Sequence, residues 1–228
     1  MADIGRRIKN RVVQVGRGLV RPYANRLFFE NLIRQTGNFS DTTWLDYPIW
    51  QNTLDLWLIQ EAISAVKPAL LIETGTNKGG SARFYAHLFD LLDQGRVLTV
   101  DIEKMHDLSH PRIEFLIGGS VDEPIIQRMQ DAAADAQGPV MVILDSDHSQ
   151  PHVAAELDVY AHLITVDSLM LVQDGVIDVL PIFSADRPGP LPAIKAFLAA
   201  HPEFVVDPRF SDRFLITHHP LGWLRRIR

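Results

Sequence analysis

The sequence predicts an α/β protein whose sheet is doubly wound, mostly parallel, and followed by an antiparallel hairpin at its C-terminal end. Short apolar runs recur along the chain, helical patterns separate most of them, and glycine or acidic residues follow them. Continuous apolar runs of this length are typical of strands that helices cover on both faces. We expect five such strands, at residues 69–72, 97–100, 113–117, 140–144 and 169–172.

Helices are expected around these strands, because apolar residues recur there at three- and four-residue spacing. The helical segments are residues 55–66, 81–92, 124–136, 153–164 and 192–200. Residues 177–192 contain several prolines, which disfavour regular structure and indicate a mobile flap. Two late strands, at residues 204–206 and 213–217, are close enough in sequence to pair antiparallel.

The N-terminal segment differs in character from the rest of the chain. An apolar stripe at helical spacing runs along residues 3–20, and residues 1–26 hold seven Lys or Arg against one Asp. Such a basic amphipathic helix packs on the body or on a second subunit, or else makes a peripheral membrane contact. Its glycines would make a lone helix marginal, which favours docking on protein. We expect an extension, residues 1–37, a single domain, residues 38–228, and a homo-oligomer.

Composition limits the class of protein further. The chain has 228 residues, a formal net charge of −6 and no cysteine. An acidic body argues against broad nucleic-acid binding, because phosphate contacts need clustered cations. The absence of cysteine excludes disulfides and zinc-thiolate sites, and it is compatible with a cytoplasmic protein. No apolar run reaches the length of about 18 residues that a membrane-spanning helix needs.

The most informative motif is the strand and glycine turn at residues 70–81, which a second strand ending in Asp101 follows. The motif fits neither phosphate-binding pattern, because Gly-x-Gly spacing is missing and Ser81 stands where a P-loop needs lysine. Glu73 would repel a pyrophosphate and suit a cation, and Asp101 could hold ribose hydroxyls. These features predict S-adenosylmethionine as the cofactor. The expected cofactor contacts are Glu73, Gly75, Thr76, Lys78, Gly79, Ser81, Asp101, Ser120 and Asp145.

The fourth and fifth strand ends carry polar residues that this cofactor does not require. Asp145, Gln173 and Asp174 offer oxygen ligands that suit Mg²⁺, and His148 follows Asp145 by three residues. A neutral histidine there could act as the general base that takes the proton of an acceptor hydroxyl. Each residue could instead be a helix cap, a turn residue or a surface histidine. The context of His152, His162, His218 and His219 indicates only structural roles.

Several motifs together resemble the cephalosporin hydroxylase and rhamnosyl O-methyltransferase family. They are Glu73-Thr-Gly-Thr-Asn-Lys-Gly-Gly-Ser81, Gly119-Ser120, Leu144-Asp-Ser-Asp-His148 and Val172-Gln-Asp174, and the likeness extends from about Trp50 to Trp223. The resemblance implies a Rossmann-like fold of the class I methyltransferase type and an enzyme, often magnesium-dependent and oligomeric, that methylates hydroxyls of sugars or other natural products. It places the metal ligands on Asp145, Gln173 and Asp174, and the base on His148. Gln173 departs from the family pattern, because a neutral amide replaces a charged ligand.

Three functions are compatible with these residues. The leading hypothesis is an O-methyltransferase with a small-molecule or glycosylated acceptor. A metal-dependent hydrolase built on Asp145, Asp147 and His148 is the second, and methyl transfer with S-adenosylmethionine would distinguish the two. A non-catalytic subunit that binds a partner through residues 3–20 is the third. The sequence carries no pattern that identifies the acceptor.

Overall fold

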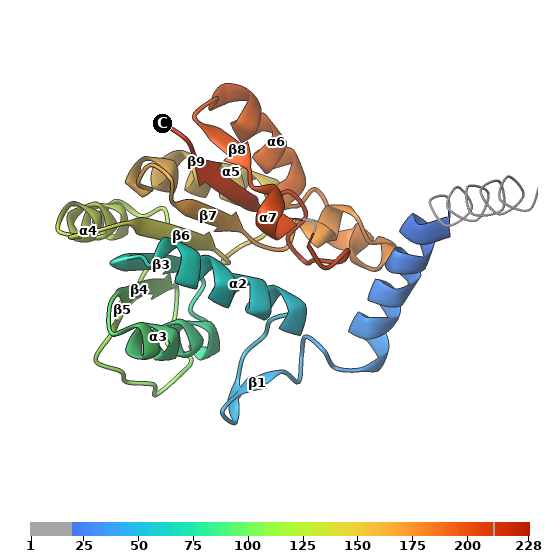
Figure 1. Ribbon diagram of the computed structural model, residues 1–228, viewed down its shortest axis with the longest axis horizontal. Helices are drawn as coiled ribbons and strands as arrows, with labels where there is room; N and C mark the ends of the chain where they lie inside the picture. The colour runs from blue at the N-terminus through green and yellow to red at the C-terminus, as the bar shows by residue number, and fades with distance from the viewer. Residues whose placement is uncertain (1–19, 212) are drawn as a thin grey trace, which may run out of the picture. The chain divides into compact units, whose positions relative to one another are not determined.

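The computed structural model describes residues 20–211 and 213–228, and the chain divides into two units, residues 1–37 and 38–228 (Figure 1). In the first unit, the described residues 20–35 form a helix. The amphipathic stripe expected over residues 3–20 lies outside the described residues except for position 20. The second unit carries all of the candidate site residues.

The second unit contains a seven-stranded sheet in the order β5-β4-β3-β6-β7-β9-β8. Its strands are β3 (Leu70–Thr74), β4 (Arg96–Asp101), β5 (Ile113–Ile117), β6 (Val140–Leu144), β7 (Leu169–Val172), β8 (Phe204–Val206) and β9 (Trp223–Arg226). Strands β3 to β7 are parallel, and β9 runs antiparallel to both β7 and β8. The predicted fold class, a mostly parallel sheet with antiparallel strands at its C-terminal end, is confirmed.

The predicted strand at residues 213–217 is wrong. Strand β8 pairs instead with Trp223–Arg226, which also pairs with β7. Trp223 and Leu224 are fully buried in this position, whereas Leu215 is exposed. The free edge of β7 therefore pairs with β9 and not with residues 213–217. Residues 213–217 form a connection, in which the Thr217 hydroxyl donates a 2.6 Å hydrogen bond to Asp55 Oδ1.

Helices cover both faces of the sheet, as the continuous apolar runs predict. On one face α4 (Glu123–Ala134), α5 (Gln150–Tyr160) and α6 (Pro190–Ala200) bury one apolar cluster against the sheet. On the other face α2 (Thr53–Val66), α3 (Gly80–Leu92) and α7 (Pro208–Ser211) bury the second cluster. Figure 1 shows α2 and α3 in front of the parallel strands and α5 behind them.

The proline-rich segment expected to be irregular contains local structure, and so does the aromatic segment before α2. The aromatic segment before α2 forms a short antiparallel pair, β1 (Thr43–Trp44) with β2 (Tyr47–Pro48). The proline-rich segment forms two 3₁₀ helices, η2 (Gly175–Asp178) and η3 (Pro181–Asp186). Arg187 holds them, because its guanidinium donates to the carbonyls of Ile177 and Leu180 at 2.7 and 2.8 Å. Hydrogen bonds from a single side chain produce no repeating pattern of apolar residues, so the sequence does not predict this local structure.

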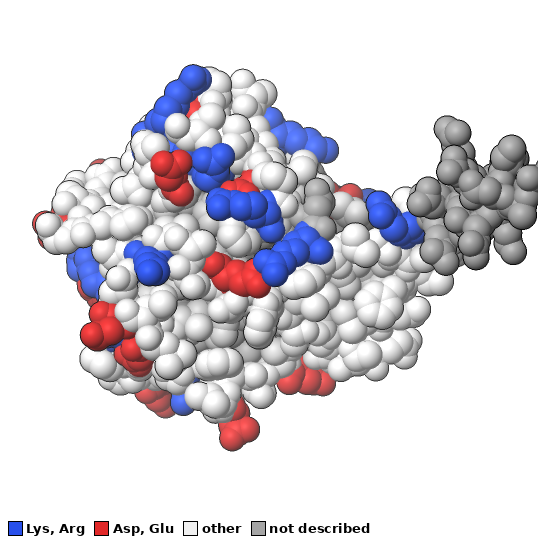
Figure 2. Space-filling model, viewed as in Figure 1, with Lys and Arg blue, Asp and Glu red and all other residues white. Residues whose placement is uncertain are grey.

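The described residues include no helix with the length and apolar content needed to cross a bilayer. Figure 2 shows acidic and basic side chains interspersed on a mainly uncharged surface, and no continuous basic surface covers the described residues of the second unit on this face.

Candidate active site

The ends of β3 and β6 meet at the position where the strand order reverses. Gly75 follows β3 in a left-handed conformation, with φ of +88°, and a Cβ there would lie 1.8 Å from the carbonyl oxygen of Asp145. Only glycine permits so close an approach. The predicted cofactor turn and the predicted acid of the fourth strand are therefore neighbours. They lie in the crevice in which open α/β sheets bind ligands.

Asp101 ends β4 and holds the glycine turn. Its Oδ2 accepts a 2.7 Å hydrogen bond from the backbone amide of Asn77, and its Oδ1 accepts one of 2.7 Å from the amide of Ile102. Asn77 has a positive φ of 46°, so the carboxylate stabilises an uncommon backbone conformation. Each carboxylate oxygen has a second lone pair, which ribose hydroxyls could use.

Packing fixes the rest of the turn. Lys78 Nζ lies 5.0 Å from the centre of the half-exposed Trp50 ring. Helix α3 begins after Gly79, which has φ of +78°. A Cβ at Gly80 would lie 1.9 Å from the carbonyl oxygen of Pro48, so the segment after β2 covers the start of the helix.

Glu73 lies fully buried beneath this turn. Its Oε2 accepts a 2.6 Å hydrogen bond from the Thr99 hydroxyl, which also contacts the Thr76 hydroxyl at 2.6 Å. Burial raises the pKa of Glu73 to about 7, although the hydroxyls of the buried Ser81 and of Thr99 oppose that rise. A carboxyl that binds the turn from below organises it, and when ionised it provides negative charge for a cationic ligand.

Ser120, at the end of the third predicted strand, belongs to a second polar network. Its hydroxyl lies 3.1 Å from His152 Nε2, and Tyr160 donates a 2.6 Å hydrogen bond to its carbonyl. His152 Nε2 also lies 3.4 Å from Oε1 of the buried Glu156, which accepts a 2.6 Å bond from the Ser146 hydroxyl. The bond to Glu156 raises the pKa of His152. The sequence indicates only a structural role for His152, but in the fold its ring contacts Ser120, a predicted cofactor residue.

Three predicted residues of the fourth and fifth strand ends form one cluster. Asp145, His148 and Asp174 each offer a ligand atom, and these atoms lie within 4.8 Å of one another. His148 Nε2 is 3.1 Å from Asp174 Oδ2 and 4.0 Å from Asp145 Oδ1. The Gln51 amide donates a 2.9 Å hydrogen bond to Asp145 Oδ2. Two carboxylates and an imidazole at this separation suit a divalent cation.

The two carboxyl groups of this cluster have opposite pKa shifts. Burial, followed by the charges of Asp174 and Glu73, raises the pKa of Asp145 well above its ordinary value. Burial acts in the same direction on Asp174, but His148 and His218 outweigh it and lower its pKa. Among the described residues, neither aspartate forms an ion pair with Lys or Arg. A divalent cation at this cluster would favour the ionised form of Asp145, because it would offset the repulsion from Asp174 that helps to raise that pKa.

The C-terminal segment supplies two contacts that sequence reasoning missed. His218 Nδ1 lies 3.4 Å from Asp174 Oδ1, and His219 Nδ1 accepts a 3.0 Å bond from the Asp174 amide. Asp55 holds the segment, because it accepts from the Thr217 hydroxyl and, at 2.8 Å, from the His218 amide. More than 40 residues separate Asp174 from this segment in sequence, and no local pattern pairs them.

The two remaining candidates differ in position. Gln173 is buried, its backbone amide donates to Leu144 O, and its side-chain amide nitrogen has no hydrogen-bond partner in the described part of the chain. Asp147, which the hydrolase hypothesis needs, accepts a 2.7 Å bond from the Ser149 amide and is outside the cluster. The geometry therefore gives no support to that hypothesis.

Comparison with known proteins agrees with this geometry. The model of the Rhamnosyl O-methyltransferase/CmcI family matches residues 37–227. The rhamnosyl O-methyltransferase of Mycobacterium tuberculosis is 31% identical over 89% of this chain and 83% of its own length. The corresponding protein of Mycobacterium leprae is 31% identical over 83% of this chain and 86% of its own.

Solved structures show the same fold. A CmcI structure with Mg and SAM has a TM-score of 0.68 at 16% identity, covering 86% of this chain and 81% of that one. The MycE methyltransferase from the mycinamycin biosynthetic pathway, in complex with Mg and SAH, has a TM-score of 0.52 at 19% identity. The match covers 78% of this chain and 50% of the MycE chain.

Fold and relatives together define an O-methyltransferase whose fold is that of these SAM- and SAH-bound methyltransferases. The chain belongs to the Rhamnosyl O-methyltransferase/CmcI family, and its activity is O-methylation.

Proposed function

We propose that this enzyme transfers the methyl group of S-adenosylmethionine to a hydroxyl of a sugar or of another natural product. The observation that carries the proposal is the contact between Gly75 and Asp145, which puts the cofactor turn beside the cluster of Asp145, His148 and Asp174. The names of the relatives, rhamnosyl O-methyltransferase, make a glycosylated acceptor the leading candidate.

The turn at residues 75–81 and the end of β4 are proposed to bind the cofactor. Asp101 would hold the ribose hydroxyls, Ser120 would lie on the nucleoside side, and Gly75 would permit backbone approach. The buried Glu73 would act electrostatically from below the turn. S-adenosylmethionine supplies an electrophilic methyl group on a sulfonium, and the carboxylates of Glu73 and Asp145 favour that positive charge.

His148 is proposed as the general base. The acceptor oxygen forms a bond to the methyl carbon as the carbon–sulfur bond breaks, and the electron pair of that bond stays on sulfur. A ring nitrogen of His148 takes the hydroxyl proton, and Asp174, 3.1 Å away, stabilises the imidazolium. The proton then leaves to solvent, because the His148 side chain is 30% exposed.

The donor set of the cluster also fits a divalent cation. Asp145 and Asp174 would hold it, with His148 and Gln173 beside it. Such a cation would lower the pKa of the acceptor hydroxyl and orient it. Gln173 would offer its side-chain oxygen, a neutral ligand that contributes less than a carboxylate. Its amide nitrogen, which has no hydrogen-bond partner among the described residues, is a donor and would not bind the cation.

Methyl transfer to a panel of rhamnosides and other glycosides tests the proposal. The His148→Ala variant should lose about 10²- to 10⁴-fold in turnover, the range for loss of a general base, and S-adenosylhomocysteine affinity should stay nearly unchanged. His162→Ala is the matched control, because His162 is exposed on η1 (Ala161–Leu163), and it should retain full activity. Full activity in His148→Ala would refute the base assignment, and failure to methylate any glycoside would refute the acceptor class.

A further inference from the structure

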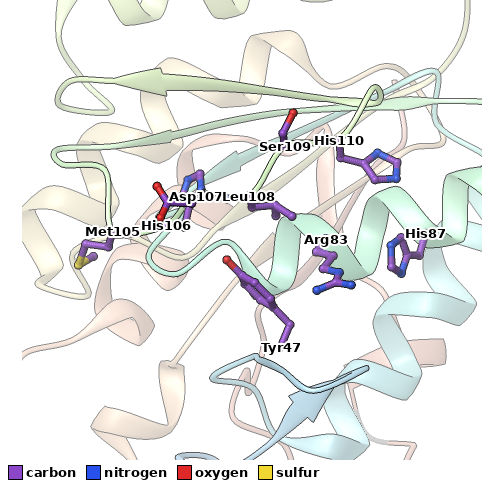
Figure 3. A pocket seen from close by; sticks show the side chains of 9 residues that line it. All are labelled: Tyr47, Arg83, His87, Met105, His106, Asp107, Leu108, Ser109 and His110. Carbon is purple, nitrogen blue, oxygen red and sulfur yellow. Dashed lines mark hydrogen bonds between the residues drawn. The ribbon is translucent and has the colours of Figure 1, made fainter.

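A hollow of about 640 Å³ lies beside the glycine turn of the candidate active site (Figure 3). Three segments line it, namely β2, helix α3, and the connection between β4 and β5. The lining residues are Tyr47, Arg83, His87, Met105, His106, Asp107, Leu108, Ser109 and His110. The candidate active site uses none of these residues. The volume is within the range of small-molecule sites.

The hydrogen bonds of the three histidines fix their tautomers. His87 Nδ1 accepts a 2.9 Å bond from the Trp44 indole, and His106 Nδ1 accepts a 3.2 Å bond from the Leu108 amide. His110 Nδ1 accepts a 3.2 Å bond from the Arg112 amide. A neutral imidazole that accepts at Nδ1 carries its proton at Nε2. All three rings therefore offer Nε2–H as a donor.

Two of these donors have no acceptor. His110 Nε2 lies 3.1 Å from Asp90 Oδ2, so its N–H donates a hydrogen bond to that carboxylate. In the described part of the chain, Nε2 of His87 and Nε2 of His106 have no hydrogen-bond partner. Burial, followed by neighbouring cations, lowers the pKa of each ring, so the neutral form with this fixed tautomer predominates.

Arg83 adds a full positive charge to the same hollow. Its guanidinium lies 5.0 Å from the centre of the Tyr47 ring, and it forms no ion pair with any described carboxylate. Asp107 is the only acid in the lining; it is exposed and lies away from the Arg83 guanidinium in Figure 3. The hollow thus combines one cation and two N–H donors that have no acceptor among residues 20–211 and 213–228. Tyr47 and Leu108 provide apolar surface beside them.

We infer that this hollow binds an organic oxyanion, a phosphate ester or a carboxylate with an apolar body. Arg83 would contact the anion through its guanidinium fork, and Nε2–H of His87 and His106 would donate to its oxygens. The apolar body would lie against Tyr47 and Leu108. The hollow adjoins the glycine turn, because a Cβ at Gly79 would meet Leu108 at 3.2 Å and His106 at 3.4 Å, but it shares no residue with the proposed cofactor contacts.

Calorimetry on enzyme saturated with S-adenosylhomocysteine tests the inference, because the active site is then filled. The probes are phenyl phosphate, benzoate and inorganic phosphate. Phenyl phosphate or benzoate should bind, and whichever binds more tightly identifies the anion. The organic probe should bind more tightly than inorganic phosphate, since the apolar body contributes. In NMR spectra of the ¹⁵N-histidine-labelled enzyme, the ring-nitrogen signals of His87 and His106 should shift when the organic probe is added.

Variants locate the binding. Arg83→Met should lower the affinity for the organic probe by about tenfold or more, as expected for loss of a charge-assisted hydrogen bond. The affinity of Arg83→Lys for the organic probe should lie between the affinities of Arg83→Met and of the wild type. Arg128→Met is the control, because Arg128 pairs with Glu114 and does not line the hollow. The affinity of this variant for the organic probe should equal that of the wild type. His106→Phe is a second variant should Arg83→Met fail to fold. No binding at millimolar probe, or equal affinity in Arg83→Met or His106→Phe, would overturn the inference.

Discussion

At Glu73, burial and protonation are directly linked. It is fully buried, burial raises its pKa to about 7, and the ordinary value is 4.5. The folded state therefore binds more protons than the unfolded state between pH 4.5 and 7. It follows that the Glu73 contribution to the free energy of unfolding is full at low pH and is lost as the pH rises through this window.

Replacing Glu73 by Gln should remove this pH dependence. The amide keeps an acceptor for the Thr99 hydroxyl but cannot ionise, so the variant without ligand should gain stability relative to wild type as the pH rises from 5 to 8. The gain should not exceed about 3 kcal/mol, since one pKa unit corresponds to about 1.4 kcal/mol. Urea unfolding across this range measures it. Glu103→Gln is the exposed control, and a Glu73→Gln difference that did not vary with pH would contradict the prediction.

Gln173 permits a second prediction at the scale of one residue. Its buried amide nitrogen has no partner among the described residues, and it adjoins Asp174 in sequence. A carboxylate there adds a charged oxygen ligand, so Gln173→Glu should bind Mg²⁺ roughly tenfold more tightly or better. Thermal unfolding in Mg²⁺ and in chelator measures the effect, because a ligand that binds the folded state raises its stability.

Gln127→Glu provides the control for that measurement, because Gln127 is exposed on α4, far in sequence from the cluster. Its response to Mg²⁺ should equal that of the wild type. An unchanged response in Gln173→Glu would place this side chain away from any cation.

At the scale of elements, the position of α3 depends on its first residue. A Cβ at Gly80 would lie 1.9 Å from Pro48 O and 2.8 Å from Ile49 Cα, both backbone atoms. Gly80→Ala must therefore displace either the helix or the segment after β2. We expect a loss of about 1 to 3 kcal/mol in unfolding free energy, the range for overpacking, together with weaker binding of S-adenosylhomocysteine.

Gly138→Ala is the comparison for this variant. A Cβ there would meet only Ala69, at 3.1 Å from its Cβ and 4.0 Å from its nitrogen. Gly138→Ala should lower the free energy of unfolding by less than Gly80→Ala does, and its affinity for S-adenosylhomocysteine should equal that of the wild type. Equal effects from the two substitutions would show that the contact with Pro48 does not set the position of α3.

Most elements could be predicted from local pattern, and their ends shifted by only a few residues. Strands β5, β6 and β7 have the predicted bounds. The runs of β6 and β7 are buried throughout, whereas β5 lies at the edge of the sheet and is only half-buried. Strand β9 could not be predicted, since its residues Trp223 and Leu224 are followed by Arg225 and Arg226 and resemble a terminal tail. Its place is decided by the free edge of β7, which is a tertiary property.

At the scale of the whole molecule, the role of the N-terminal extension stays a prediction. We propose that it docks on protein and maintains a homo-oligomer rather than binding lipid. A chain shortened to residues 38–228 should keep its affinity for S-adenosylhomocysteine and become a smaller species in size-exclusion chromatography with light scattering. If the shortened chain kept its size and only the full chain floated with anionic liposomes, a membrane role would replace this proposal.

The sequence by itself determined the parallel strands and the positions of Asp101, Asp145, His148 and Asp174, because apolar runs mark buried strands and parallel strands deliver their ends to one edge. Only the tertiary structure decided which other side chains reach that edge. Gln51 lies 94 residues from Asp145 in the chain, and the Asp55 carboxylate holds a backbone amide 163 residues away. Such contacts arise because α2 and the C-terminal segment pack at the same end of the sheet. Local sequence carries no record of that packing, since its energy comes from surfaces that meet only in the folded chain.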